Sequence, residues 1–138
     1  MKRFINHPAE FPIVVSTAGS ERRDQTSLCH LSDGCLTCHL SRAFSTGEPV
    51  TLEVPAISQP CTLLGNVANC HRCGEGFRVN IRFADDDEIF KSKMLEQVCQ
   101  IEHYRRELLR TGRALDCETA AHEWIEQYSD QFSAALTR

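Results

Sequence analysis

No apolar run in this chain approaches the roughly 18 to 20 residues that a membrane-spanning helix needs, although hydrophobic residues make up 41% of its 138 residues. The N-terminal residues, Met1 to Pro8, are basic but lack the apolar centre and the small-residue cleavage site of a secretory signal. We therefore expect a cytoplasmic protein without a membrane span.

An excess of positive charge is also missing. The chain has 15 lysines and arginines against 19 acidic residues, so its net charge is −4, and no overall basic field draws it to a nucleic-acid polymer. Motifs of common enzymes are missing too: there is no Gly-x-Ser-x-Gly elbow, no phosphate-binding glycine loop and no His-Glu-x-x-His helix. The six histidines are scattered. The sequence predicts that the protein is not an enzyme.

Cysteine, by contrast, is abundant, with eight in the chain. A reducing compartment argues against disulfides, which leaves metal ligands, reactive thiols or small buried hydrophobic side chains. The run Cys35-Leu-Thr-Cys38-His39 matches the attachment pattern of c-type haem, but haem is attached after export, and no export signal is seen. We do not expect haem.

Two Cys-x-x-Cys pairs, Cys35 with Cys38 and Cys70 with Cys73, have the composition of a structural zinc site. However, positions three apart on an extended strand point to opposite faces. We therefore favour alternating buried and exposed cysteines and keep zinc as an alternative.

The first part of the chain reads as short strands separated by turns. Residues 1–10 form an irregular arm, and alternating or β-branched patterns predict strands at 11–17, 25–31, 35–40, 50–54, 61–70 and 77–83. A turn at Ser32-Asp33-Gly34 joins the second and third strands. Six strands without intervening helices predict an antiparallel barrel or sandwich over residues 1–84.

Residues 85–138 change to helical periodicity. Acids at 85–88 begin a helix whose apolar stripe is Phe90, Met94, Val98, Ile101 and Leu108, and Gly112 ends it. Asp116 caps a second helix with the stripe Ala120, Trp124, Tyr128 and Phe132. These stripes predict packing against the other helix, the barrel or another subunit. The result is a helical hairpin appended to the barrel.

Taken together, a basic arm, a Ser-x-Gly turn between two strands and the closing strand Gly-Phe-Arg-Val-Asn-Ile-Arg-Phe resemble a PilZ domain. The segments 93–106 and 120–128 resemble a PilZ subgroup with a helical tail. The resemblance covers nearly the whole chain. It implies a bacterial six-stranded barrel that binds cyclic di-GMP and regulates a protein partner in motility or biofilm signalling.

The family's two binding motifs are both altered here. The arm motif, Arg-x-x-x-Arg, corresponds to Arg3 with His7, or to Lys2 with Asn6; the turn motif, Asp/Asn-x-Ser-x-x-Gly, has His30 first, keeps Ser32 and has Gly34 one position before its end. The resemblance therefore implies a ligand site made by Lys2, Arg3, His7, His30, Ser32 and Gly34.

Three hypotheses follow. The first is a PilZ-type receptor whose arm folds over cyclic di-GMP against the Ser32–Gly34 turn. The second is a degenerate PilZ adaptor that no longer binds nucleotide and acts through protein contacts, including a homodimer through the C-terminal helices. The third is a zinc-stabilised β domain that uses the four cysteines named above.

Overall fold

The computed structural model describes residues 5–17, 22–32, 34–57 and 61–136. Lys2, Arg3 and Asp33 lie outside these residues. Eight strands and two helices follow one another along the chain: β1 (Ile5–Asn6), β2 (Ile13–Thr17), β3 (Arg23–Thr26), β4 (Cys29–Ser32), β5 (Cys35–Leu40), β6 (Pro49–Glu53), β7 (Thr62–Cys73), β8 (Gly76–Phe83), α1 (Asp86–Arg110) and α2 (Cys117–Leu136).

All eight strands belong to one antiparallel sheet in the order β1-β4-β5-β8-β7-β6-β2-β3. The sheet is open, because β1 and β3 are its two edges. The protein is therefore mainly β with two C-terminal helices, as the sequence predicted. The expected closed barrel of six strands is a wrong prediction.

The extra strands come from two places in the sequence. The segment 25–31, predicted as one strand, contains the end of β3 and most of β4, with a break at Ser27 and Leu28. In addition, Ile5 and Asn6, predicted as part of an irregular arm, pair with Leu31 and His30 of β4. A two-residue strand has almost no periodicity of its own, so only its pairing partner reveals it.

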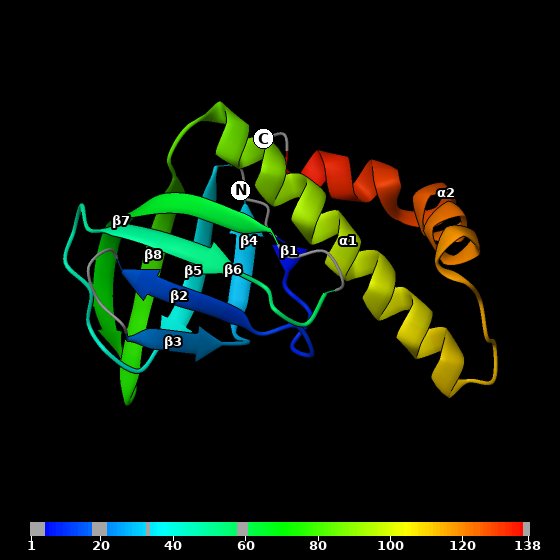
Figure 1. Cartoon of the computed structure of the whole chain (residues 1–138), viewed down its shortest axis with the longest axis horizontal. Coiled ribbons are helices and arrows are strands. Elements are labelled where there is room, and N and C mark those ends of the chain that lie inside the picture. Colours follow the sequence, from blue (N-terminus) through cyan, green and yellow to red (C-terminus); the bar gives the residue numbers. More distant parts are fainter. Residues whose placement is uncertain (1–4, 18–21, 33, 58–60, 137–138) are drawn as a thin grey trace.

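The open sheet is nevertheless strongly curled (Figure 1). Strand β3 is one edge, whereas β4 is next to the other edge, yet three peptide steps join Thr26 to Cys29 and can span only about 10 Å. The two ends of the sheet must therefore approach each other. The enclosed side holds the core, with Val15, Leu52, Val79 and Ile81 almost completely buried.

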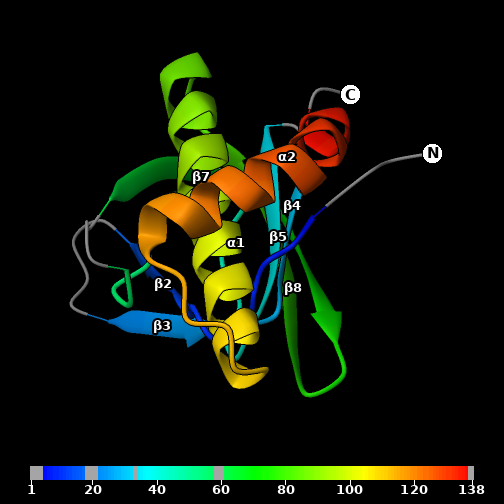
Figure 2. The same cartoon turned by 90° about the vertical axis from the view of Figure 1, so that its right-hand side faces the viewer.

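The helices cover the open side of this core. Helix α1 contributes Leu95 and Cys99 to the same hydrophobic cluster as the strands. Burial of a side chain the size of leucine stabilises the fold by about 1.5–3 kcal/mol. Helix α2 then turns back across α1 (Figure 2) and buries Ala120 and Trp124.

The helix boundaries agree with the sequence signals. The Asp85 carboxylate accepts a hydrogen bond from the Glu88 amide at 2.9 Å, and Asp116 accepts one from the Thr119 amide at 2.7 Å. Gly112 follows α1 at φ 93°, a conformation that glycine adopts without steric cost. The predicted helices and their caps are confirmed.

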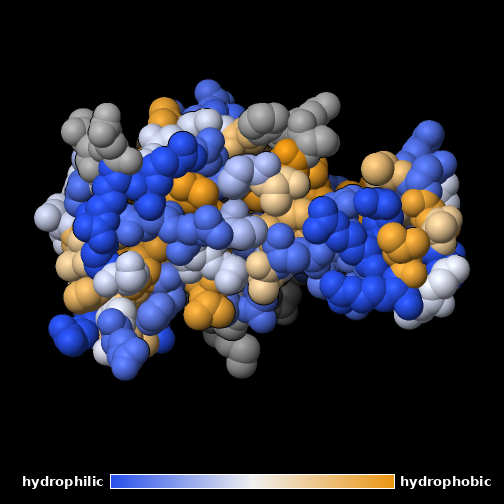
Figure 3. Space-filling model, turned by 60° about the horizontal axis from the view of Figure 1, so that its bottom comes forward, coloured by the Kyte–Doolittle hydropathy of each residue, from blue (hydrophilic) through white to orange (hydrophobic). Residues whose placement is uncertain are grey.

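The predicted apolar stripe of α1 does not point into this core. Phe90, Met94 and Val98 are 64%, 46% and 49% exposed. In Figure 3 the end of the helical region projects beyond the sheet, and hydrophobic residues are exposed in separate patches on a largely hydrophilic surface. The stripe was expected to pack against the sheet, the other helix or another subunit. Neither the sheet nor α2 covers these three residues.

Among the described residues, neither helix is long and apolar enough to cross a membrane.

Candidate functional site

One row of polar side chains crosses five neighbouring strands on the outer side of the sheet. The pairing register aligns Asn6 of β1 with His30 of β4, Thr37 of β5, Asn80 of β8 and Asn69 of β7. Laterally paired residues share a face of a sheet. The core therefore lies on the other side of these strands.

Side-chain hydrogen bonds join Asn6 to His30 at one end of this row and Thr37, Asn80 and Asn69 at the other. The His30 ring, through Nδ1, bonds Asn6 Oδ1 at 2.6 Å. The Thr37 hydroxyl donates to Asn80 Oδ1 at 2.6 Å, and Asn80 Nδ2 donates to Asn69 Oδ1. The row is thus a pre-ordered set of donors and acceptors.

Two further rows flank this one and bring positive charge. On one side, His39 pairs with Arg78, which pairs with His71. On the other, Cys35 pairs with Arg82, which pairs with Asn66. We call these three rows, together with Ser32, the polar face.

The charge of the polar face differs from that of the chain as a whole. Arg78 and Arg82 are both exposed there, and none of the residues in its rows is acidic, although the net charge of the chain is −4. A guanidinium group offers a planar set of N–H donors that matches phosphate or a guanine edge. The polar face therefore has the chemistry to bind a small anionic ligand.

Two of the site residues expected from the sequence lie on this face. His30 and Ser32 alternate on β4, so they share its outer side, and Ser32 is paired with Cys35, the neighbour of Arg82. Gly34 follows in the turn at φ 75°, and its carbonyl accepts a hydrogen bond from the Phe83 amide at 3.1 Å. The strands thus bring Ser32 and Gly34 near Arg82 of β8.

His7 is placed differently, because its neighbour Asn6 faces outward and His7 faces inward. Its side chain is only 1% exposed, and Nδ1 lies 2.8 Å from Glu96 Oε1 of α1. The other ring nitrogen bonds the Phe11 carbonyl, while Glu96 also accepts from Gln100 at 2.8 Å. Both ring nitrogens therefore have protein partners, and His7 anchors the N-terminal segment to α1.

The environment of His7 favours its charged form. Burial by itself would lower the pKa of the imidazole, but the hydrogen bond and charge of Glu96, with the Phe11 carbonyl, raise it above its ordinary value of 6.5. The carbonyl can only accept a hydrogen bond, so the nitrogen facing it must donate. When Glu96 is ionised the other nitrogen donates as well, and the ring is an imidazolium ion.

The remaining expected residues, Lys2 and Arg3, lie outside the described residues. The residues that sequence reasoning missed are the outward side chains of β8, namely Arg78, Asn80 and Arg82. The signal for them was present, because these are the three polar residues of the most regularly alternating strand. Their alignment with His30 and Asn6 depends on pairing between distant segments, which the alternation alone does not show.

The four cysteines of the zinc hypothesis follow the alternation of their strands. Cys38 is buried and pairs with Val79, and Cys70 pairs with Val79 from the other side. Cys35 and Cys73 are each three residues away from these inward thiols and so face outward. The four thiolates do not converge in this arrangement.

Among the other cysteines, two are buried deeply enough to be poor nucleophiles. Burial, followed by the nearby charge of Glu96, raises the pKa of the Cys99 thiol to about 12. A hydrogen bond with Cys38 and burial likewise raise the pKa of Cys29. Because the thiolate is the reactive form, both thiols are suited to packing rather than chemistry.

Comparison of the chain with models of protein families, with curated proteins and with solved structures finds no match.

Proposed function

We propose that this protein is a non-enzymatic PilZ-type regulatory module that binds cyclic di-GMP on the polar face and controls a protein partner in motility or biofilm signalling. The observation that carries the proposal is the meeting of His30 and Ser32 with Asn6 and Arg82 on one face without acidic residues. A doubly anionic ligand needs such a combination of cations and neutral hydrogen-bonding groups.

The N-terminal segment adds further charge to this region by its sequence. Arg3 and Lys2 precede Asn6 by three and four residues, and three residues span about 10 Å at most. Chain length alone therefore keeps Arg3 within reach of the polar face. In the proposed complex, Arg3 and Arg82 contact phosphate or guanine, and Ser32 and His30 hydrogen-bond the ligand.

The same segment offers a path from ligand to partner. Asn6 belongs to the polar face, while His7 is bonded to Glu96 of α1 and the Asn6 carbonyl accepts from Gln100 at 3.0 Å. A ligand that moves this segment therefore acts on contacts with the helix. In the proposal, the change in α1 is what the partner recognises.

Calorimetric titration with cyclic di-GMP tests the proposal. Arg82→Ala should weaken binding by about 1–3 kcal/mol, by analogy with guanine readout by arginine, which is roughly a fivefold to 150-fold loss. The matched control is Arg72→Ala, because Arg72 is an exposed arginine on the adjacent strand whose guanidinium lies over the Phe77 ring at 5.8 Å. Absence of heat at high micromolar ligand would discard the receptor proposal.

A second candidate function is the adaptor that acts only through protein contacts, and the exposed stripe of α1 favours it. Phe90, Met94 and Val98 line a hollow together with Ile57 and Cys61. We propose a second copy of this chain as the occupant, in a homodimer built on the helices. Exposed apolar side chains grouped around a hollow in this way are typical of interaction sites.

Sedimentation velocity distinguishes this candidate. Val98→Glu should convert a dimer into a monomer, whereas Leu109→Glu, at an exposed apolar position near the end of the same helix, should leave the dimer intact. A wild-type protein that sediments as a monomer at all concentrations would reject the homodimer.

A further inference from the structure

We propose that Glu10, His103 and Glu107 form a binding site for one divalent transition-metal ion that fastens the N-terminal segment to α1. Within the part of the chain that the structure describes, these residues form a group whose three ligand atoms all lie within 4.8 Å of one another. The site is separate from the polar face, and the proposal does not depend on the proposed function.

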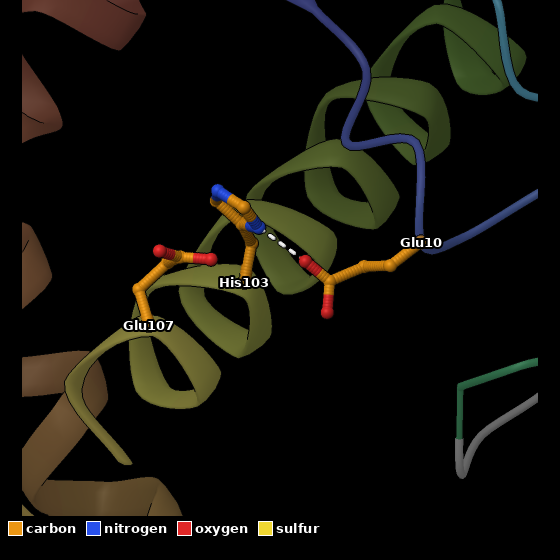
Figure 4. A group of neighbouring side chains, drawn as sticks. All are labelled: Glu10, His103 and Glu107. Carbon is orange, nitrogen blue, oxygen red and sulfur yellow. Dashed lines mark hydrogen bonds and ion pairs between the residues drawn. The ribbon is translucent and has the colours of Figure 1, made fainter. Parts of the chain in front are cut away.

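The three ligands come from two segments that are far apart in sequence. His103 and Glu107 are four residues apart on α1, and this spacing places them one above the other on the same side of the helix. Glu10 approaches them from the loop after β1 (Figure 4), and its Oε1 contacts His103 Nδ1. The helix therefore supplies a rigid pair of ligands, and the loop supplies the third.

Imidazole and carboxylate groups are ordinary ligands of Zn²⁺ and related ions, with metal–ligand distances of about 2.0–2.2 Å. Two ligands on a tetrahedral ion at these distances are about 3.4 Å apart. No two ligand atoms of this group are more than 4.8 Å apart, so the widest pair needs to close by about 1.4 Å at most. Glu10 Oε1 and His103 Nδ1, which are in hydrogen-bond contact, need to separate to admit the ion. Side-chain rotation of the partly exposed Glu10 and His103 can provide this movement.

Space for the rest of the coordination shell lies beside the group. His103 and Glu107 also line a cavity of about 550 Å³ between α1 and α2, whose wall includes Tyr104, Trp124 and Tyr128. Three protein ligands and an open side correspond to a metal site that keeps positions for water or an exchangeable ligand. An ion held here can therefore bind water or an exchangeable ligand from the cavity.

Neighbouring arginines bind the carboxylates of Glu10 and Glu107 and influence their orientation and charge. Arg106 Nη1 donates to Glu10 Oε2 at 3.2 Å, which leaves Oε1 directed at His103. Burial would raise the pKa of Glu10, but the hydrogen bonds and charges of His103 and Arg106 hold it below its usual range. Glu107 is paired with Arg110, so this arginine competes with a metal ion for the same carboxylate.

Metal binding here exchanges one cation for another. The ion takes the lone pair of a ring nitrogen of His103, and any proton carried by that nitrogen is released to solvent. No bond other than the N–H bond breaks, and no electron is transferred. The expected result is a firmer link between Glu10 and α1. It adds to the buried contact of His7 with Glu96, which joins the same N-terminal segment to the helix.

Titration of the full chain with Co²⁺ tests the proposal. The expected result is one bound ion without the sulfur-to-metal charge-transfer absorption that cysteine ligation produces. His103→Asn and Glu10→Gln should each weaken binding by at least about tenfold, because even supporting groups of metal sites cost that much. Arg110→Gln should strengthen binding, because it removes the competitor for Glu107.

The chain contains a matched control on α2. His122 and Glu126 are also a histidine and a glutamate four residues apart on a helix, with 3.6 Å between Nδ1 and Oε1. No third ligand joins this pair among the residues that the structure describes. His122→Asn should leave Co²⁺ binding unchanged. A loss equal to that of His103→Asn would show an adventitious ion only and would overturn the proposal.

Hydrogen exchange gives a second readout that does not depend on absorption. Saturating Co²⁺ should slow exchange of the amides of His7 and Phe11, which donate to the carbonyls of Cys29 and Pro8. The same ion should have no effect on them in Glu10→Gln. Binding that shows a thiolate absorption band, or that leaves these amides unchanged in the wild type, would also reject the site.

Discussion

The N-terminal segment meets α1 through two histidine–glutamate pairs of the same chemistry in opposite surroundings. In the first, the side chains of His7 and Glu96 are 1% and 6% exposed. In the second, those of His103 and Glu10 are 40% and 20% exposed. The partners are 89 and 93 residues apart in sequence, so both pairs are purely tertiary contacts.

The difference shows that solvent access determines how much a histidine–glutamate pair contributes to stability. A buried ion pair cannot lose one partner without leaving an uncompensated charge in a medium of low polarity. An exposed pair loses little, because water replaces the missing partner. His7 with Glu96, the inner pair, is therefore a fixed anchor. His103 with Glu10, the outer pair, is free to exchange its proton or its partner.

The largest effect should come from the same substitution made in both pairs. Glu96→Ala should lower the free energy of unfolding by roughly 3–5 kcal/mol, because it leaves a buried imidazolium without a counter-ion. Glu10→Ala should cost no more than about 1 kcal/mol. Urea denaturation of both variants and the wild type at neutral pH measures the two values.

A volume-filling control separates charge from packing in this comparison. The double substitution His7→Leu with Glu96→Leu removes both charges together and should cost less than Glu96→Ala alone, since hydrophobic groups often replace buried pairs without loss. Equal costs for Glu96→Ala and Glu10→Ala would show that burial does not distinguish the two pairs.

The next effect is a dependence of stability on pH that belongs to the inner pair. The pKa of His7 is raised in the folded protein by Glu96 and Phe11 against the opposing effect of burial. A raised pKa means that the folded state binds the proton more tightly than the unfolded state. The contribution is thus complete below the unfolded value of about 6.5 and is lost as pH rises through the folded pKa.

Urea denaturation at a series of pH values from 5.5 upward measures this contribution. In the wild type, the part of the free energy of unfolding that comes from His7 should fall as pH rises above about 6.5. His7→Gln should remove this slope and leave the slopes of other groups in place. An unchanged pH profile in His7→Gln would contradict a charged anchor at this position.

Local patterns predicted those elements whose signals lie within a few residues. The alternation at 35–40 predicted β5 with its observed limits, and the acids at 85–88 and Gly112 predicted the ends of α1. Capping and alternation are interactions between near neighbours. Such interactions operate in the same way whatever the rest of the chain does.

The contacts that sequence reasoning missed depend on partners that are distant in the sequence. Nothing near His7 shows that Glu96 lies opposite it, and Glu96 in an amphipathic helix resembles a solvent-exposed acid. The stripe of Phe90, Met94 and Val98 predicts packing against the other helix, the sheet or another subunit, and the α1 side chains that enter the core are instead Leu95 and Cys99. Packing of the stripe against another subunit stays a prediction. The direction in which a helix docks depends on the whole sheet, and helical spacing alone does not determine it.

The smallest effect tests the outer pair itself. A double-mutant cycle of Glu10→Ala and His103→Ala should give a coupling free energy of about 0.2–1 kcal/mol, as for other exposed pairs. The Debye length falls to about 3 Å at 1 M salt, so the coupling should nearly vanish there, while the cost of Glu96→Ala should persist. Coupling that survives 1 M salt would mean that Glu10 and His103 are as well shielded from solvent as His7 and Glu96, and the distinction between anchor and exchangeable site would not hold.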